Sequence, residues 1–160
     1  MALVPDIVES WRHPRLVVRR HLARPRSEAF AFTFLFVFLL VAFVAQWPQA
    51  ARASYLHPEV PLTQRLLAAG LGLMATIPAW YGLAALSRLI ARALGGQGNW
   101  YGTRVALFWA LAAVSPAMLL QGLTSGLLGP GAQAELVGAL VAVAFLVLWL
   151  AMLREEEGAT

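Results

Sequence analysis

The stretch that decides the fold reads RLLAAGLGLMATIPAWYGLAALSRLIARALGGQGNWYGTRVALFWALAAVSPAMLLQ and extends from Arg65 to Gln121. No charge lies between Arg65 and Arg88, and these 22 residues give a helix of ~33 Å, enough to cross a bilayer. A second apolar run follows Arg104, and each run contains one proline. The stretch therefore predicts two membrane-spanning helices joined by a short glycine-rich loop.

The composition of the whole chain is that of a membrane protein. Of its 160 residues, 60% are apolar and only 12% are charged, which is outside the range of ordinary soluble domains. Cysteine is absent, so disulfides and thiolate metal sites are excluded. All 12 basic residues are arginines, and six of them precede the first apolar run. A positive-inside bias explains these arginines without a nucleic-acid partner.

Hydropathy predicts an all-α integral membrane protein with four transmembrane helices and an N-terminal amphipathic interfacial helix. A basic amphipathic segment covers residues 1–28, and an acidic tail covers residues 155–160. The transmembrane domain covers residues 29–154, with spans at about 29–47, 64–93, 103–122 and 134–153.

Prolines and glycines set the expected ends of these spans. Trp47-Pro48 closes the first span, and residues 48–64 are expected to form an extended loop outside the cell. Residues 122–131, GLTSGLLGPG, are expected to end the third helix and turn. The small residues around Arg52 resemble a signal-peptide cleavage site, but the basic region before the span is too long for a signal peptide.

The arginine distribution predicts the orientation. Ten arginines fall in the N-terminal segment, around the glycine-rich loop and at Arg154, whereas only Arg52 and Arg65 fall on the other side. Both termini are therefore expected in the cytoplasm, in a multi-pass protein.

The N-terminal segment predicts two short helices, near residues 6–12 and 14–23, that lie flat at the membrane interface. We expect its arginines to face lipid headgroups. The expected partners are anionic lipids, together with other integral membrane proteins or a second copy of this chain. The alternative is that the arginines act only as a topology signal. The candidate headgroup residues are Arg12, Arg15, Arg19, Arg20, Arg24 and Arg26.

The two prolines of the central stretch predict matched helix kinks. Pro78 and Pro116 cannot donate to the carbonyls of the residues four before them, and the two prolines lie ~15 and ~18 Å from the flanking arginines. Such kinks either open a cavity or bend two helices around each other. We expect Tyr81 to donate a hydrogen bond to the freed Ala112 carbonyl or to Ser115.

Small residues predict where the spans pack closely. Such residues recur every three or four positions in three spans, which are given below in the order third, last and second. The members are Ala106, Ala110, Ala113 and Ala117, then Ala134, Gly138 and Ala142, and then Gly72, Thr76 and Ala79.

No catalytic or metal-binding pattern is present in the sequence. The loop GGQGNWYG lacks the spacing of a dinucleotide site, and the histidines at 13, 21 and 57 are too scattered for a metal site. We therefore expect no enzyme activity and no cofactor. The loop is expected to be a flexible cytoplasmic turn with interfacial aromatic residues; its candidate residues are Gly95, Gly96, Gly98, Trp100 and Tyr101.

The segments DIVESWRHPRLVVRR and ARALGGQGNWYGTRVALFW, together with a proline in the second span, make the chain resemble a short bacterial member of the Yip family. Eukaryotic relatives interact with Rab GTPases in vesicle traffic, and a bacterium has no Rab system. The resemblance implies a multispanning inner-membrane protein that organises the membrane or serves as an accessory or assembly subunit. The alternative is a small oligomeric transporter or channel built on the proline-kinked hairpin.

Overall fold

The computed structural model describes residues 3–158, and these residues form helices and no strand. Four stretches are long and apolar enough to cross a membrane, which confirms the predicted all-α, four-span architecture. They are α3, α4 with α5, α6 and α7. The helices are α1 (Leu3–Ser10), α2 (Pro14–Leu22), α3 (Glu28–Leu56), α4 (Leu62–Ala75), α5 (Ile77–Ala93), α6 (Trp100–Leu128) and α7 (Ala132–Gly158).

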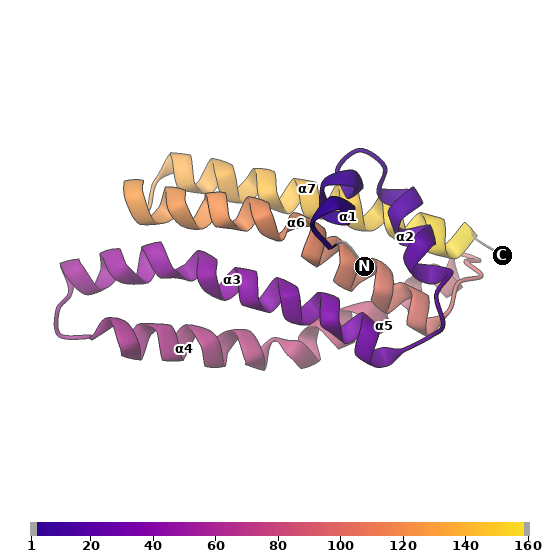
Figure 1. The fold of residues 1–160 in the computed structure, drawn as a ribbon, viewed down its shortest axis with the longest axis horizontal. Helices are drawn as coiled ribbons and strands as arrows, with labels where there is room; N and C mark the ends of the chain where they lie inside the picture. Colours follow the sequence, from indigo (N-terminus) through magenta and orange to yellow (C-terminus); the bar gives the residue numbers. More distant parts are fainter. Residues whose placement is uncertain (1–2, 159–160) are drawn as a thin grey trace.

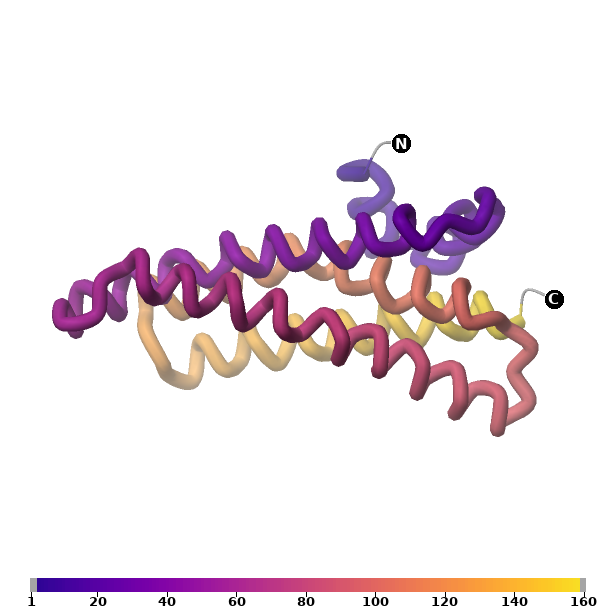
Figure 2. Tube along the Cα trace, turned by 90° about the horizontal axis from the view of Figure 1, so that it is seen from below, coloured from indigo at the N-terminus to yellow at the C-terminus, as the bar shows by residue number. Residues whose placement is uncertain are grey.

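The spans form two antiparallel pairs that lie along one another (Figures 1 and 2). α3 runs beside α4 in one pair and α6 runs beside α7 in the other, and α3 packs extensively on α6. α3 begins and α7 ends at the same end of the bundle, which we call the terminal end. The connections at residues 57–61 and 129–131 lie at the opposite end, which we call the loop end.

The core is centred on the first half of α6. Between Tyr101 and Ser115 every residue except Arg104 is buried, and the side chains of Trp109 and Phe108 are completely enclosed together with Phe34 of α3. This burial on all sides requires neighbours in every direction. α3, α5 and α7 supply three of them, and the short helices α1 and α2 cover the remaining side of α6.

Two spans are longer than the sequence predicted, and both predictions of their ends were wrong. α3 continues through Pro48 to Leu56, and α6 continues through Gly122 to Leu128. A proline inside a helix removes one hydrogen bond, but the residues after Pro48 are good helix formers, and neighbouring helices hold both segments.

Close packing between α3 and α6 explains why Gly122 and Gly126 lie within a helix. A Cβ atom added to Gly122 would lie 2.0 Å from the Ala45 carbonyl oxygen, and one added to Gly126 would lie 2.3 Å from Cβ of Pro48. The two glycines are four residues apart and therefore share one face of α6. They let the two backbones approach closely, which is the usual basis of helix association in membranes.

The second span is interrupted rather than smoothly bent. α4 ends at Ala75 and α5 begins at Ile77, with Pro78 in the first turn of α5. The Thr76 hydroxyl at the break donates to the Leu73 carbonyl at 2.6 Å and accepts a hydrogen bond from the Trp80 indole at 3.1 Å. These bonds give the Thr76 hydroxyl and the Trp80 indole partners at the break.

The predicted packing stripes have different outcomes. Ala106, Ala110 and Ala113 are completely buried in α6, as expected. The stripe in the second span was wrongly predicted, because α4 buries none of its residues and a Cβ atom on Gly72 would meet nothing within 4 Å. That face of α4 is left to the membrane.

The acidic C-terminal residues are part of the fold rather than a separate tail. α7 continues through Glu155, Glu156 and Glu157 to Gly158. The predicted boundary at residue 155 therefore divides a continuous helix, because the glutamates have partners at the terminal end that the sequence pattern does not reveal.

Candidate functional site

The N-terminal hairpin, α1 with α2, is packed against the side of the bundle. The Trp11 indole donates to the Ala113 carbonyl at 3.0 Å, and the Trp109 indole donates to the Ser10 hydroxyl at 2.9 Å. Ala113 lies ~14 Å beyond Arg104 at the rise of a helix. The end of α1 therefore lies beside the middle of α6, and the position of both helices at the membrane interface stays a prediction.

His21 anchors α2 in an aromatic cage. Only 1% of its surface is exposed, and its ring lies 5.9, 5.0 and 4.4 Å from the ring centroids of Phe30, Phe34 and Trp109. Neither ring nitrogen has a hydrogen-bond partner within residues 3–158. Burial lowers the pKa of His21 to about 4, so the imidazole is neutral and acts as an aromatic core residue. The sequence pattern had suggested no role for it.

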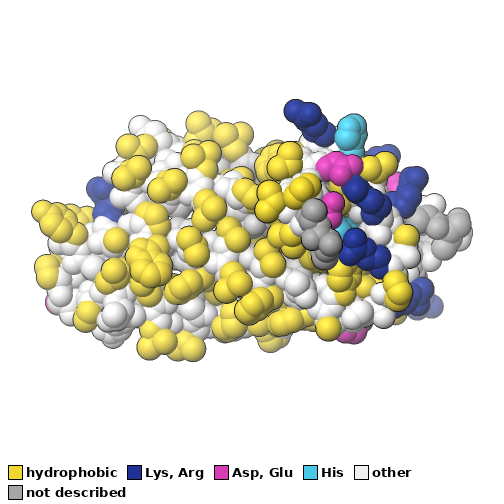
Figure 3. All heavy atoms as spheres, viewed as in Figure 1, with side chains coloured by type: hydrophobic (Ala, Val, Ile, Leu, Met, Phe, Trp, Pro, Cys, Tyr) yellow, Lys and Arg dark blue, Asp and Glu magenta, His cyan; other side chains and the backbone are white. Residues whose placement is uncertain are grey.

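The six N-terminal arginines divide into two groups. Three are occupied within the molecule: Arg19 pairs with Glu155 at 2.5 Å, Arg20 pairs with Glu9 and lies 3.8 Å from Asp6, and Arg24 lies over the Phe30 ring at 5.3 Å. The other three, Arg12, Arg15 and Arg26, are exposed and form no ion pair within the described chain. Figure 3 shows basic side chains gathered over the N-terminal hairpin, while apolar side chains cover most of the remaining face.

The glycine-rich loop holds two carboxylates of α7. The backbone N–H of Gly98 donates to Glu157 at 2.9 Å, and that of Asn99 donates to Glu156 at 2.7 Å. The buried Arg88 of α5 forms an ion pair with Glu157 at 2.7 Å. The loop, α5 and α7 are thereby fastened together, in what we call the carboxylate clasp.

Glycines in and after the loop leave room for the carboxylates of the clasp, which lie against the backbone. A Cβ atom on Gly96 would lie 2.3 Å from Glu157, and Cβ atoms on Gly98 and Gly102 would lie 2.0 and 2.2 Å from Glu156. Gly95 has a positive φ of 89°, a conformation that favours glycine. The loop is therefore a fitted cradle instead of the flexible turn that we predicted.

The two aromatic residues after the loop lie in different environments. Trp100 is exposed, as an interfacial residue would be. Tyr101 is only 7% exposed, and its buried hydroxyl has no hydrogen-bond partner in the described part of the chain. The predicted interfacial position is therefore wrong for Tyr101, because this residue lies on a side of α6 that faces the core.

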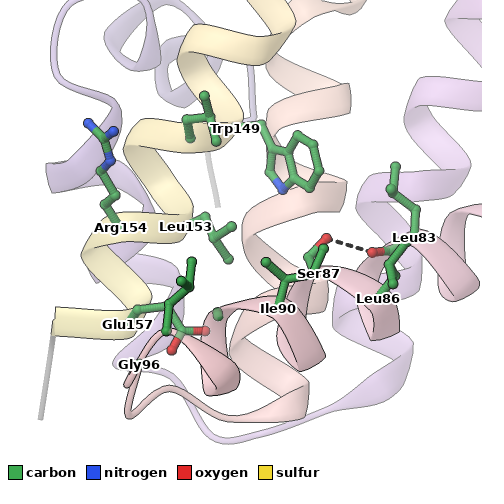
Figure 4. Close-up of a pocket in the computed structure, with 12 residues that line it drawn as sticks. Leu83, Leu86, Ser87, Ile90, Gly96, Trp149, Leu153, Arg154 and Glu157 are labelled. Atoms are coloured by element: carbon green, nitrogen blue, oxygen red, sulfur yellow. Dashed lines mark hydrogen bonds between the residues drawn. The ribbon is translucent and has the colours of Figure 1, made fainter.

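An apolar groove lies between α5 and α7 and ends at the clasp (Figure 4). Its volume is about 430 Å³. Its walls include Leu83, Ile90, Leu153 and the ring of Trp149, whose indole nitrogen is buried without a partner in residues 3–158. α5 and α7 thus separate toward the middle of the bundle.

The expected bond from Tyr81 is not formed, and this prediction was wrong. Ser115 itself donates to the freed Ala112 carbonyl at 2.8 Å, so this acceptor is satisfied within α6. The Tyr81 ring packs on Phe108 with centroids 5.0 Å apart, which keeps an interhelical contact without a hydrogen bond. Pro78 and Pro116 are both exposed, so the kinks do not face a shared buried cavity.

The described residues contain no group of three or more acidic, histidine or cysteine side chains placed to hold a metal ion. A family model described as Yip1 domain matches residues 8–156, nearly the whole chain. No curated protein and no solved structure matches the chain.

Proposed function

This chain belongs to the Yip1 domain family of multispanning membrane proteins, and we propose that it is a non-catalytic organiser of anionic lipid. The binding surface is the exposed face of the N-terminal hairpin. The protein acts there alone or as an accessory subunit of a larger inner-membrane complex.

The observation that carries the proposal is a set of three exposed guanidinium groups without ion-pair partners, on or just after a hairpin that is anchored to the bundle. Arg12, Arg15 and Arg26 have no ion-pair partner in the described chain, whereas Arg19 and Arg20 are neutralised by glutamates. The hairpin is held against α6 by two indole hydrogen bonds and by the His21 cage. A rigid basic surface loses less entropy on binding a lipid phosphate than a mobile one does.

Lipid binding by the purified full chain tests this proposal. In non-ionic detergent, native mass spectrometry is expected to show more phosphatidylglycerol than phosphatidylcholine retained. Each basic residue near an anionic surface contributes about 1 kcal/mol, so replacing Arg12, Arg15 and Arg26 by glutamine removes most of this preference. The lysine variants of the same residues keep their charge and are the matched control. Equal retention of both lipids by all three proteins contradicts the proposal.

The role as an accessory subunit is supported by the apolar face of α4. Leu67 and Leu71 are 64% and 63% exposed, and α4 contributes no residue to the core. Extraction from native membranes in mild detergent tests this role, since a subunit co-purifies with a partner at fixed stoichiometry. Replacing Leu67 and Leu71 by alanine is expected to lower that stoichiometry, and the same changes at Leu136 and Leu140 of α7 are the control.

The transporter alternative has less support. A transport path needs polar groups or a cavity through the bundle, and Tyr101 to Ser115 of α6 are packed without a gap against aromatic and aliphatic neighbours. A channel formed between copies of the chain would require the outward face of α4 and α5 to line it. Leu67, Leu71, Leu86 and Leu89 are exposed on these helices, and the exposed polar residues Gln64 and Arg92 lie near the two ends of the span.

A further inference from the structure

Two adjoining cavities lie at the loop end, away from the sites described above. The larger, of about 490 Å³, is bounded by the ends of α3, α6 and α7, and the smaller, of about 180 Å³, lies between α3 and α6. They share Gln49, Gln121 and Ser125 as lining residues, so they lie side by side. We call the pair the loop-end cavity.

The lining of this cavity is unusually polar for a membrane bundle. Gln46 and Gln49 come from α3, and Gln121 and Ser125 come from α6. None of these four side chains forms a hydrogen bond within residues 3–158. Amides and hydroxyls in a membrane need partners, so these groups are available to a polar ligand or to water.

The cavity also carries one charge of each sign. Arg52 donates to the Gly126 and Leu127 carbonyls at 3.4 and 3.1 Å, while its Nε atom is buried and has no partner in the described chain. Glu135, in the first turn of α7, lines the same space and forms no ion pair among the described residues. An arginine suits a phosphate, and a carboxylate suits an ammonium group.

The depth of the cavity identifies the kind of ligand that reaches it. At the rise of a helix, Gln46 and Arg52 lie ~27 and ~36 Å along α3 from Glu28. A hydrocarbon core is about 30 Å thick, so these residues straddle its border with the headgroups. Apolar residues such as Leu56 and Ala134 line the same space, so a molecule with both a charged head and a hydrocarbon part fits it.

We propose that the loop-end cavity binds the headgroup of an ethanolamine phospholipid from the leaflet at the loop end. Arg52 holds the phosphate, and Glu135 with the glutamine carbonyls accepts hydrogen bonds from the ammonium group. A choline headgroup has no N–H donor, and a glycerol headgroup has no positive charge, so both are disfavoured. This site is separate from the anionic-lipid surface proposed above, because it lies at the opposite end of the bundle.

The test uses the full chain in non-ionic detergent, titrated with phosphatidylethanolamine, phosphatidylcholine and phosphatidylglycerol that carry the same acyl chains. Binding is measured by native mass spectrometry and by the rise of the unfolding midpoint. We expect phosphatidylethanolamine to bind at least about tenfold more tightly than phosphatidylcholine. All proteins in this test carry glutamine in place of Arg12, Arg15 and Arg26. These changes remove the proposed anionic-lipid surface, so any remaining lipid preference tests the loop-end cavity alone.

Substitutions in the cavity assign the binding to this site. Glu135→Gln and Gln49→Leu are each expected to reduce the preference for phosphatidylethanolamine over phosphatidylcholine by about threefold to tenfold. Gln64→Leu, which removes an exposed amide at the same end outside the cavity lining, is the matched control for Gln49→Leu and leaves the preference intact.

Four results would each overturn the proposal. Equal affinity for the three lipids means that the cavity holds only water, and tighter binding of phosphatidylglycerol means that it selects an anion alone. If soluble glycerophosphoethanolamine binds as tightly as the lipid, the ligand is a small zwitterion. An unchanged preference in Glu135→Gln places the lipid elsewhere on the protein.

Discussion

His21 shows how one buried side chain fixes the N-terminal hairpin. The ring is enclosed by Phe30, Phe34 and Trp109, and its nearest charged groups are Asp6, Arg24 and Arg20. Burial is the main cause of its low pKa, and the two arginines lower it further while Asp6 opposes them. The cage therefore selects the neutral imidazole.

We predict that acid detaches this hairpin. In the released segment the His21 pKa is ~6.5, whereas in the folded protein it is about 4. As the pH falls from 6.5 to 4 only the released form gains a proton, so the stabilisation is complete above pH 6.5 and is lost through this window, by on the order of 3 kcal/mol. Hydrogen exchange of α2 at pH 7 and pH 4.5 measures it.

The His21→Leu variant is the control for this prediction. It keeps an apolar side chain in the cage and removes the titrating group, so its α2 exchange is expected to change less with pH. If the variant and the natural protein respond equally, other acidic groups cause the effect and the role given to His21 is wrong.

The packing of α3 on α6 depends on two glycines four residues apart. Gly122→Ala is expected to destabilise the bundle by about 1 to 3 kcal/mol, because the added methyl group would overlap the Ala45 carbonyl and force the two backbones apart. Gly72→Ala is the matched control, since a Cβ atom there meets nothing within 4 Å and alanine favours the helix. Thermal unfolding in non-ionic detergent compares them, and equal melting midpoints would mean that the close approach is unimportant.

The carboxylate clasp joins α5, α7 and the loop that precedes α6. Arg88→Ala is expected to cost about 3 to 5 kcal/mol, because Glu157 is then left buried beside the loop without its cation. The pair Arg88→Gln with Glu157→Gln removes both charges and is expected to recover part of this loss. Unfolding midpoints of the single and double variants measure the difference. A double variant no more stable than Arg88→Ala would show that packing, and not charge, matters at this position.

Most charged residues of the described chain gather at one end. The N-terminal hairpin and the clasp are both at the terminal end, and four spans bring α3 and α7 back to it. Because basic residues favour the cytoplasmic side, we predict that this end faces the cytoplasm.

Reporter fusions test this orientation. A reporter fused after Thr160 is expected to report the cytoplasm, and one inserted near Glu59 is expected to report the opposite side. Activity of both fusions on the same side would contradict a four-span arrangement. Reversal of both would keep the four spans and reject the predicted orientation.

The sequence by itself determined the class, the number of spans and the clustering of arginines near one end. These properties follow from local hydropathy and charge, because each transmembrane helix must satisfy its own backbone within an apolar solvent. The predicted kink in the second span also followed from a local cause, the missing N–H of Pro78, although the structure shows a break there.

Only the tertiary structure decided which groups meet. Pro48 and Gly122 look like helix ends in the sequence but lie within helices, because α3 and α6 support each other there. The tertiary structure also separates the free arginines from the paired ones. Arg20 pairs with Glu9 of α1, and Arg19 pairs with Glu155 of α7. The carboxylate clasp depends on residues about 60 positions apart, and such contacts depend on how helices pack rather than on any local pattern.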